Sequence, residues 1–218
     1  MNGLVRALKC ATWRAGRVIG ITLLMSVGFI FYFMFLNRVP FSAANIVTRF
    51  PQMVLFVGSF MYLAYGVVDV ITYVQYAMSF GSTRKDVFLS SIYMHALEIA
   101  GTELLLLLYF LLVPEKWLMT DGGTIYKMIF LVYLFSAGLS LVMGIFVKRF
   151  GKGAYIVIII LSAVLGGIVG GMVAFYGSDE LAALIPNVSV IVPLAAGGWY
   201  VAMAAIFWMN IRKMEVRV

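Results

Sequence analysis

The chain has 218 residues, of which 64% are apolar and 11% are charged, whereas a soluble domain is roughly 45–50% apolar and about 25% charged. A soluble globule cannot bury so much apolar surface, so the composition excludes a soluble enzyme and a disordered chain. The single cysteine, Cys10, excludes an internal disulfide, and the single histidine, His95, excludes paired-histidine metal motifs. The sequence therefore predicts one all-α integral membrane domain over residues 1–218.

An amphipathic helix is predicted at the N-terminus, over residues 1–17. Leu4, Leu8, Ala11 and Ala15 share one helical face, and the opposite face carries Arg6, Lys9, Trp13 and Arg17. Such a basic segment lies in the headgroup plane when it precedes a span. It is either an elbow helix that braces the first span or a simple basic anchor.

Six segments are apolar over the roughly 20 residues that a membrane span requires. The predicted transmembrane helices cover residues 18–36, 52–80, 87–113, 128–147, 153–177 and 193–211. Pro186 and Pro193 interrupt the last long apolar run, and proline breaks helices. Residues 178–192 are therefore predicted to form a broken segment at the outer surface.

The basic residues predict which way the spans run. With six spans, most Lys and Arg residues fall on one side: Arg6, Lys9, Arg14, Arg17, Arg84, Lys85, Lys148, Arg149, Lys152, Arg212, Lys213 and Arg217. Cytoplasmic loops carry an excess of such residues. Both termini are therefore predicted to be cytoplasmic, and the net charge of +7 reflects topology rather than binding to nucleic acid.

The loop between the second and third predicted spans forms a sharp corner, over residues 81–86. Gly81 is suited to end the preceding helix in the left-handed conformation. Thr83 and Asp86 have the spacing of a capping box, which starts the next helix. Arg84 and Lys85 are expected to be displayed there, either as a coupling surface or as an ordinary short loop that obeys the charge rule.

The stretch MSFGSTRKDVFLSSI, residues 78–92, resembles the Ser-x-Gly-x-Thr-Arg-Lys-x-x-Phe pattern in permease subunits of type-2 ABC exporters. Small permeases of this kind serve bacterial exporters of antimicrobial peptides, lantibiotics and phenol-soluble-modulin-like peptides. The resemblance implies six spans, an elbow helix and a partly re-entrant segment between spans five and six. It also implies a bacterial cell membrane, a second permease copy or homologue, and a separate ATPase that docks onto the corner formed by Gly81, Ser82, Thr83, Arg84, Lys85 and Asp86.

A phosphate-binding loop of the form G-x-x-x-x-G-K-[ST] does not occur in the sequence. ATP and Mg²⁺ are therefore expected on the partner ATPase, and this chain is expected to be a transport subunit, not an enzyme, without a cofactor or metal of its own.

Four ionisable residues fall inside predicted spans, where such groups are costly and usually face the protein interior. They are Asp69, His95, Glu98 and Glu103. Asp69 and Glu98 have matching depths on adjacent helices, so a cluster that includes His95 is predicted. It is either a structural hydrogen-bond knot or a site of proton coupling or substrate contact.

Glycines also mark one face of the fifth predicted span, in two overlapping G-x-x-x-G registers formed by Gly166, Gly167, Gly170 and Gly171. Such glycines let helix backbones approach closely. The face is predicted to serve either internal packing or dimerisation.

Two functions follow from these features. The leading interpretation is the membrane-spanning half of an ATP-driven exporter of hydrophobic or amphipathic cargo, such as peptides. The alternative is an ion- or proton-coupled carrier that uses the intramembrane acids. An intramembrane enzyme is disfavoured because the sequence has no catalytic motif.

Overall fold

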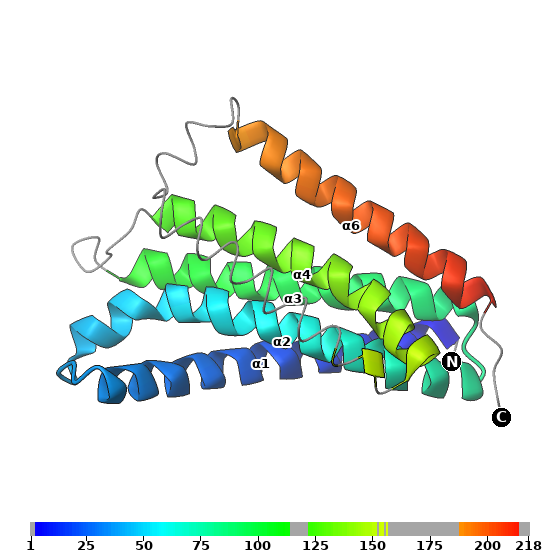
Figure 1. Ribbon diagram of the computed structural model, residues 1–218, viewed down its shortest axis with the longest axis horizontal. Coiled ribbons are helices and arrows are strands. Elements are labelled where there is room, and N and C mark those ends of the chain that lie inside the picture. The colour runs from blue at the N-terminus through cyan, green and yellow to red at the C-terminus, as the bar shows by residue number, and fades with distance from the viewer. Residues whose placement is uncertain (1–2, 114–121, 152, 155, 157–187, 214–218) are drawn as a thin grey trace.

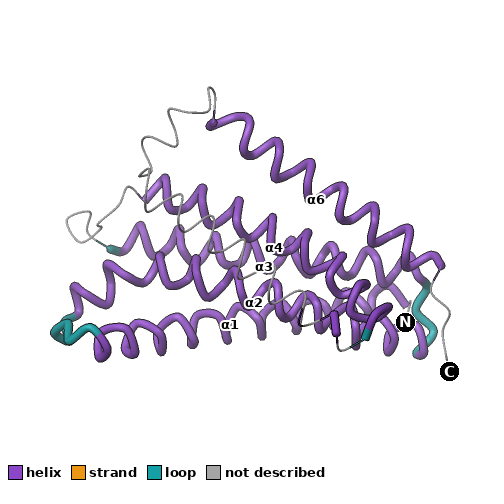
Figure 2. The backbone as a smooth tube through the Cα atoms, viewed as in Figure 1, coloured by secondary structure: helices purple, strands orange, loops and turns teal. Residues whose placement is uncertain are grey.

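The computed structural model describes residues 3–113, 122–151, 153–154, 156 and 188–213. These residues form five helices and no strand: α1 (Gly3–Leu36), α2 (Ala43–Ser79), α3 (Arg84–Leu112), α4 (Gly122–Phe150) and α6 (Val188–Lys213). All five are long and apolar enough to cross a membrane. The chain is therefore an all-helical, multi-pass membrane protein (Figures 1 and 2).

The first three helices run up and down alongside one another, and α4 and α6 run parallel to each other (Figure 1). The start of α1, the α2–α3 connection and the ends of α4 and α6 therefore share one end of the bundle. We call this the basic end, because the described residues near it include Arg6, Lys9, Arg84, Lys85, Lys148, Arg149, Arg212 and Lys213.

The distribution of side chains suits a lipid environment. Large apolar side chains point outward, and Leu24, Phe35 and Leu112 are each more than 70% exposed. The buried set includes polar and charged side chains, namely Thr22, Ser26, Asp69, Ser90, Ser91, His95, Glu98, Thr102, Glu103, Ser136 and Ser140. Apolar surroundings outside and polar groups inside are the arrangement expected when the solvent is hydrocarbon.

Helix α1 is one uninterrupted helix, so the boundary predicted between residues 17 and 18 is wrong and a separate helix over 1–17 is not seen. No proline and no Ser, Thr, Asn or Asp N-cap interrupts the sequence there, and small residues continue along one buried face. This buried stripe contains Ala7, Ala11, Ala15, Val18, Thr22, Ser26, Ile30 and Met34. The prediction that one face of this segment is basic and exposed agrees with the structure, since Arg6, Lys9, Trp13 and Arg17 are exposed.

Helix α2 begins at Ala43, earlier than the predicted start at residue 52, and continues through Pro51. Ser42 caps it, because its side chain accepts a hydrogen bond from the amide of Asn45 at 3.2 Å. A proline inside a helix leaves the carbonyl four residues earlier without its usual partner. Here that carbonyl belongs to Val47, and the hydroxyl of Tyr109 on α3 donates to it. This contact with α3 replaces the missing hydrogen bond, so α2 continues through Pro51.

Helix α6 also begins earlier than predicted, at Val188 rather than residue 193. Residues 188–192 therefore do not belong to a broken segment. Pro193 lies near the start of α6, where its missing N–H removes a single helical hydrogen bond. The rest of the predicted 178–192 segment, and nearly all of the predicted span 153–177, lie outside the described residues.

Helices α2 and α4 pack most extensively, through small residues on both sides. A Cβ added at Gly58 would overlap the Tyr133 side chain, and one at Gly66 would overlap Ser140. From the other side, Gly144 faces Val70 in the same way. These contacts form what we call the glycine seam, and they bring the two helices close enough to hold the buried polar groups beside them.

Candidate functional site

The α2–α3 corner is ordered by hydrogen bonds that close both helices. Gly81 has φ +81°, and its amide donates to the Met78 carbonyl at 3.1 Å. The Ser82 amide donates to the Ala77 carbonyl at 3.0 Å. These two bonds make a Schellman motif, as expected for a glycine in the left-handed conformation after a helix.

Helix α3 starts with the predicted capping box. The Thr83 hydroxyl accepts from the Asp86 amide at 3.2 Å, and the Asp86 carboxylate accepts from the Thr83 amide at 3.1 Å. Arg84 and Lys85 are exposed between these bonds, while Ser82 and Asp86 are half-buried. The corner is therefore a short, fixed turn that presents two bases at the basic end.

The start of α1 packs against this corner. A Cβ added at Gly3 would lie 3.3 Å from Asp86 Oδ2 and 3.8 Å from the Gly81 carbonyl oxygen. Further along, the Tyr73 hydroxyl of α2 donates to the Ala7 carbonyl at 3.4 Å. Helices α1, α2 and α3 are thus joined at the corner, and a force on the corner would reach all three.

A buried ion pair lies deeper in the bundle. Arg14 of α1 pairs through Nη1 with Oδ1 of Asp69 on α2. The guanidinium also lies over the ring of Tyr73, with Cζ 3.4 Å from the ring centroid. The side chains of Arg14 and Asp69 are only 14% and 8% exposed. The partner of Asp69 is therefore Arg14 rather than His95 or Glu98.

Glu98 and His95 lie on α3 beside this ion pair, and both are at most 2% exposed. Glu98 lies within electrostatic range of Arg14, and its Oε1 has no hydrogen-bond partner among the described residues. His95 Nδ1 lies 3.4 Å from the Tyr200 hydroxyl on α6. Four helices thus contribute to one buried polar cluster, formed by Arg14, Asp69, His95, Glu98 and Tyr200.

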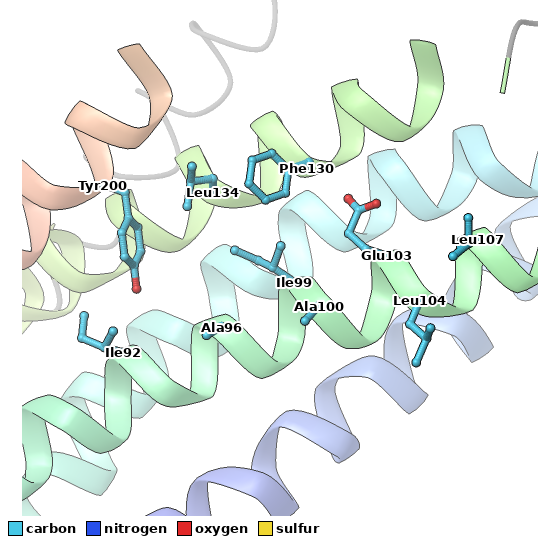
Figure 3. Close-up of a pocket in the computed structure, with 10 residues that line it drawn as sticks. All are labelled: Ile92, Ala96, Ile99, Ala100, Glu103, Leu104, Leu107, Phe130, Leu134 and Tyr200. Carbon is cyan, nitrogen blue, oxygen red and sulfur yellow. The ribbon is translucent and has the colours of Figure 1, made fainter. Parts of the chain in front are cut away.

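Glu103 lies apart from this buried polar cluster. It is 5% exposed and lines a cavity of about 550 Å³ between α3, α4 and α6. Figure 3 shows its side chain on the side of α3 that faces Phe130 of α4, and both carboxylate oxygens are buried. The four predicted intramembrane residues therefore divide into a cluster of three and a separate carboxylate.

Helix α6 reaches the cavity and the cluster because it is anchored on α4. The Trp199 ring stacks on Phe135 with centroids 4.8 Å apart. Gly138 leaves room for Trp199, since a Cβ there would lie 3.2 Å from the indole. The neighbouring Tyr200 then points toward α3, where it lines the cavity and reaches His95.

Arg14 and Tyr200 were missed by the sequence analysis. For Arg14 a signal was present: it lies two helical turns after Ala7, on the face that is otherwise made of small residues. A basic residue on that face points toward the neighbouring helices and not toward the membrane surface. For Tyr200 the sequence holds no comparable signal, because its role depends on how α6 packs on α4. The predicted glycine face at Gly166, Gly167, Gly170 and Gly171 lies outside the described residues.

The described residues hold no group of three or more His, Cys, Asp or Glu side chains arranged to bind a metal ion. The polar cluster can hold a proton or a charge pair inside the bundle, and the corner presents the exposed bases Arg84 and Lys85. Comparison with known proteins finds no family model, no curated protein and no solved structure that matches this chain.

Proposed function

We propose that this chain is the membrane-spanning permease half of an ATP-driven exporter that moves hydrophobic or amphipathic cargo out of a bacterial cell. A separate ATPase subunit would bind ATP and Mg²⁺, and a second permease copy or a homologue would complete the transporter. The α2–α3 corner carries this proposal, because it is fixed by caps on both sides and displays Arg84 and Lys85.

The direction of the helices supports six spans for this permease. Helix α4 ends at one end of the bundle and α6 begins at the other (Figure 1). The span predicted over residues 153–177 lies almost wholly outside the described residues, and it is part of the proposal. With that span, both termini and the basic end face the cytoplasm, as the excess of Lys and Arg predicts.

The corner is suited to pass a movement of the ATPase on to the helices. Short, doubly capped turns resist bending, and the first turn of α1 packs on the same residues. Movement of a docked ATPase would therefore shift α1, α2 and α3 together. The cargo path would lie between two such halves.

A charge reversal at the corner tests this function. We expect the double variant Arg84→Glu, Lys85→Glu to insert normally but to lose the ATPase, because both displayed bases become acids. The measurement is vanadate-sensitive ATP hydrolysis that co-purifies with the tagged chain from membranes of its native cell. A loss of at least tenfold is expected, since two charge reversals at one interface cost several kcal/mol.

The matched control is Arg212→Glu, Lys213→Glu, which makes the same charge change at the same end of the bundle but on α6 and not on the corner itself. This variant should keep the co-purifying activity. If wild-type chain carries no ATP hydrolysis above an untagged sample, or if both double variants lose it equally, the exporter proposal is wrong.

A second candidate function is a proton-coupled carrier, and the buried cluster of Arg14, Asp69, His95, Glu98 and Tyr200 favours it. Such a carrier would accumulate a fluorescent hydrophobic dye in proteoliposomes under an imposed pH gradient without ATP, and Glu98→Gln would stop that uptake. If the cluster is only a structural knot, the chain alone shows no gradient-driven uptake. In that case uptake appears only when the ATPase and ATP are added.

A further inference from the structure

Helix α1 forms one edge of the bundle, with α2 and α3 packed against it (Figure 1), and its opposite face is exposed. From residue 18 to residue 36 the exposed side chains carry no charge, and this stretch is about 29 Å long at 1.5 Å per residue. That length matches the roughly 30 Å of the hydrocarbon core of a bilayer. Arg17 therefore lies where the hydrocarbon ends, and Trp13, one turn earlier, lies at the level of the lipid headgroups.

Three exposed side chains form a row at this level, because each lies four residues after the one before: Lys9, Trp13 and Arg17. The Arg17 guanidinium lies over the Trp13 ring, with Cζ 5.7 Å from the ring centroid. Trp13 is itself 65% exposed, so the pair is on the surface. A cation–π contact uses the flat face of a guanidinium, and its in-plane N–H groups can still donate to a phosphate.

The part of the chain that the structure describes supplies no exposed acid to neutralise these bases. Asp69, Glu98 and Glu103 are buried, and the half-buried Asp86 closes the capping box of α3. The charge that complements the row therefore comes from outside the described residues. At the level of the headgroups, the abundant anion is the phosphate of an acidic phospholipid.

The surface of α1 beside and above the row is open. A Cβ added at Gly16, Gly20 or Gly28 would meet nothing within 4 Å, so an extended acyl chain can lie against the helix. Glycines four residues apart also let two helices pack closely, but Arg17 follows Gly16 directly. A second copy packed in parallel through these glycines would bring two Arg17 side chains together, and like charges repel. Charge therefore favours an anionic lipid over a second copy on this face.

We propose that the row of Lys9, Trp13 and Arg17 binds an anionic phospholipid of the leaflet at the basic end. Arg17 donates to the headgroup phosphate, Trp13 lies beside it, and Lys9 adds a second positive charge that attracts the lipid. One acyl chain follows the open surface past Gly20. A zwitterionic lipid has the same phosphate but also carries a cation, which the two bases repel. This inference goes beyond the proposed function and needs no ATPase.

Native mass spectrometry of the purified full chain tests the site, with phosphatidylglycerol or phosphatidylcholine of identical acyl chains titrated into the micelles. We expect the first phosphatidylglycerol to bind at least tenfold more tightly than the first phosphatidylcholine. The double variant Lys9→Gln, Arg17→Gln should weaken phosphatidylglycerol binding about tenfold, because both bases act at the membrane surface. Glycerol phosphate, which has the charge without acyl chains, should not displace the lipid. Displacement at equal concentration would show a site for free phosphate and overturn the proposal.

Two further variants separate charge from aromatic contact. Arg17→Lys keeps the positive charge and should keep most of the preference for phosphatidylglycerol. Trp13→Leu removes the ring under the guanidinium and should weaken binding of phosphatidylglycerol about threefold. Thermal unfolding and gel-filtration profiles show that each variant is folded.

The matched control is Arg212→Gln, Lys213→Gln, which removes two bases from the same end of the bundle but from α6. Arg212 also lies over a tryptophan, Trp208, but that ring is half-buried and packs on Phe88 of α3. This control variant should bind both lipids as the wild-type chain does. An equal loss in the control would assign the preference to the overall charge of the basic end and overturn the proposal.

Equal binding of the two lipids, or a preference that survives the loss of both Lys9 and Arg17, would also overturn the proposal. Cross-linking examines the remaining alternative, with Gly20→Cys placed in a Cys10→Ser chain and oxidised in membranes. We expect no disulfide-linked dimer, and efficient dimer formation would show that a second copy covers this face, which refutes the lipid site. Because the lipid assay contains neither ATPase nor ATP, its failure leaves the exporter proposal to its own experiment at the corner.

Discussion

Replacing Arg14 with Met is expected to destabilise the folded protein by about 3–5 kcal/mol, because it leaves the buried carboxylate of Asp69 without its partner. The same substitution removes the cation over the Tyr73 ring and a positive charge that acts on Glu98. The free energy of unfolding is measured by denaturant titration in mixed micelles.

The control is Arg17→Met, which removes an exposed base from the same helix and should change stability by no more than about 0.5 kcal/mol. The double variant Arg14→Met, Asp69→Asn should recover part of the loss, since neither buried charge then remains unpaired. Equal stability of Arg14→Met and Arg17→Met would contradict the ion pair. The ion pair would also be contradicted if the double variant lost more stability than the two single variants lose together.

Gly66→Leu is expected to have the next largest effect, because there is no space for a side chain in the glycine seam. A Cβ at Gly66 would overlap the Ser140 side chain of α4 and would lie 3.4 Å from His95 Nε2. Helices α2 and α4 would have to separate, at a cost of about 3 kcal/mol. Circular dichroism and the same titration would report retained helices with reduced stability.

Gly28→Leu on α1 is the matched control, since a Cβ at Gly28 meets nothing within 4 Å. This change should leave the free energy of unfolding nearly unchanged, because the added side chain would point outward from the bundle. If Gly66→Leu is as stable as Gly28→Leu, α2 and α4 do not pack through the glycine seam.

The features that depend on near neighbours in the chain could be predicted from the sequence. Apolar length predicts helices that cross a membrane, because no span can leave its backbone groups unpaired in lipid. The corner from Gly81 to Asp86 could be predicted in detail, since its hydrogen bonds join residues only a few positions apart. The sequence also predicts which ends of the spans carry the excess of Lys and Arg residues, because that needs only the order of spans and loops along the chain.

Helix ends were predicted less well where a distant residue supplies the missing interaction. The second span was predicted to start at residue 52, yet α2 begins at Ala43 and continues through Pro51, where Tyr109 donates to the carbonyl that the proline leaves unpaired. Likewise, Arg14 looked like one more base at the membrane surface, but packing of α1 against α2 places it on Asp69.

The cluster and the cavity depend on the rotation and depth of whole helices. The pairing of Arg14 with Asp69, the approach of Tyr200 to His95 and the separation of Glu103 from Glu98 each depend on how two or more helices pack. Glycines at Gly66 and Gly138 permit that packing by their lack of a side chain, and a single sequence does not reveal which neighbour will fill the space. Hydropathy and local hydrogen bonds thus determined the helices and the corner, while close packing between helices decided which buried groups meet.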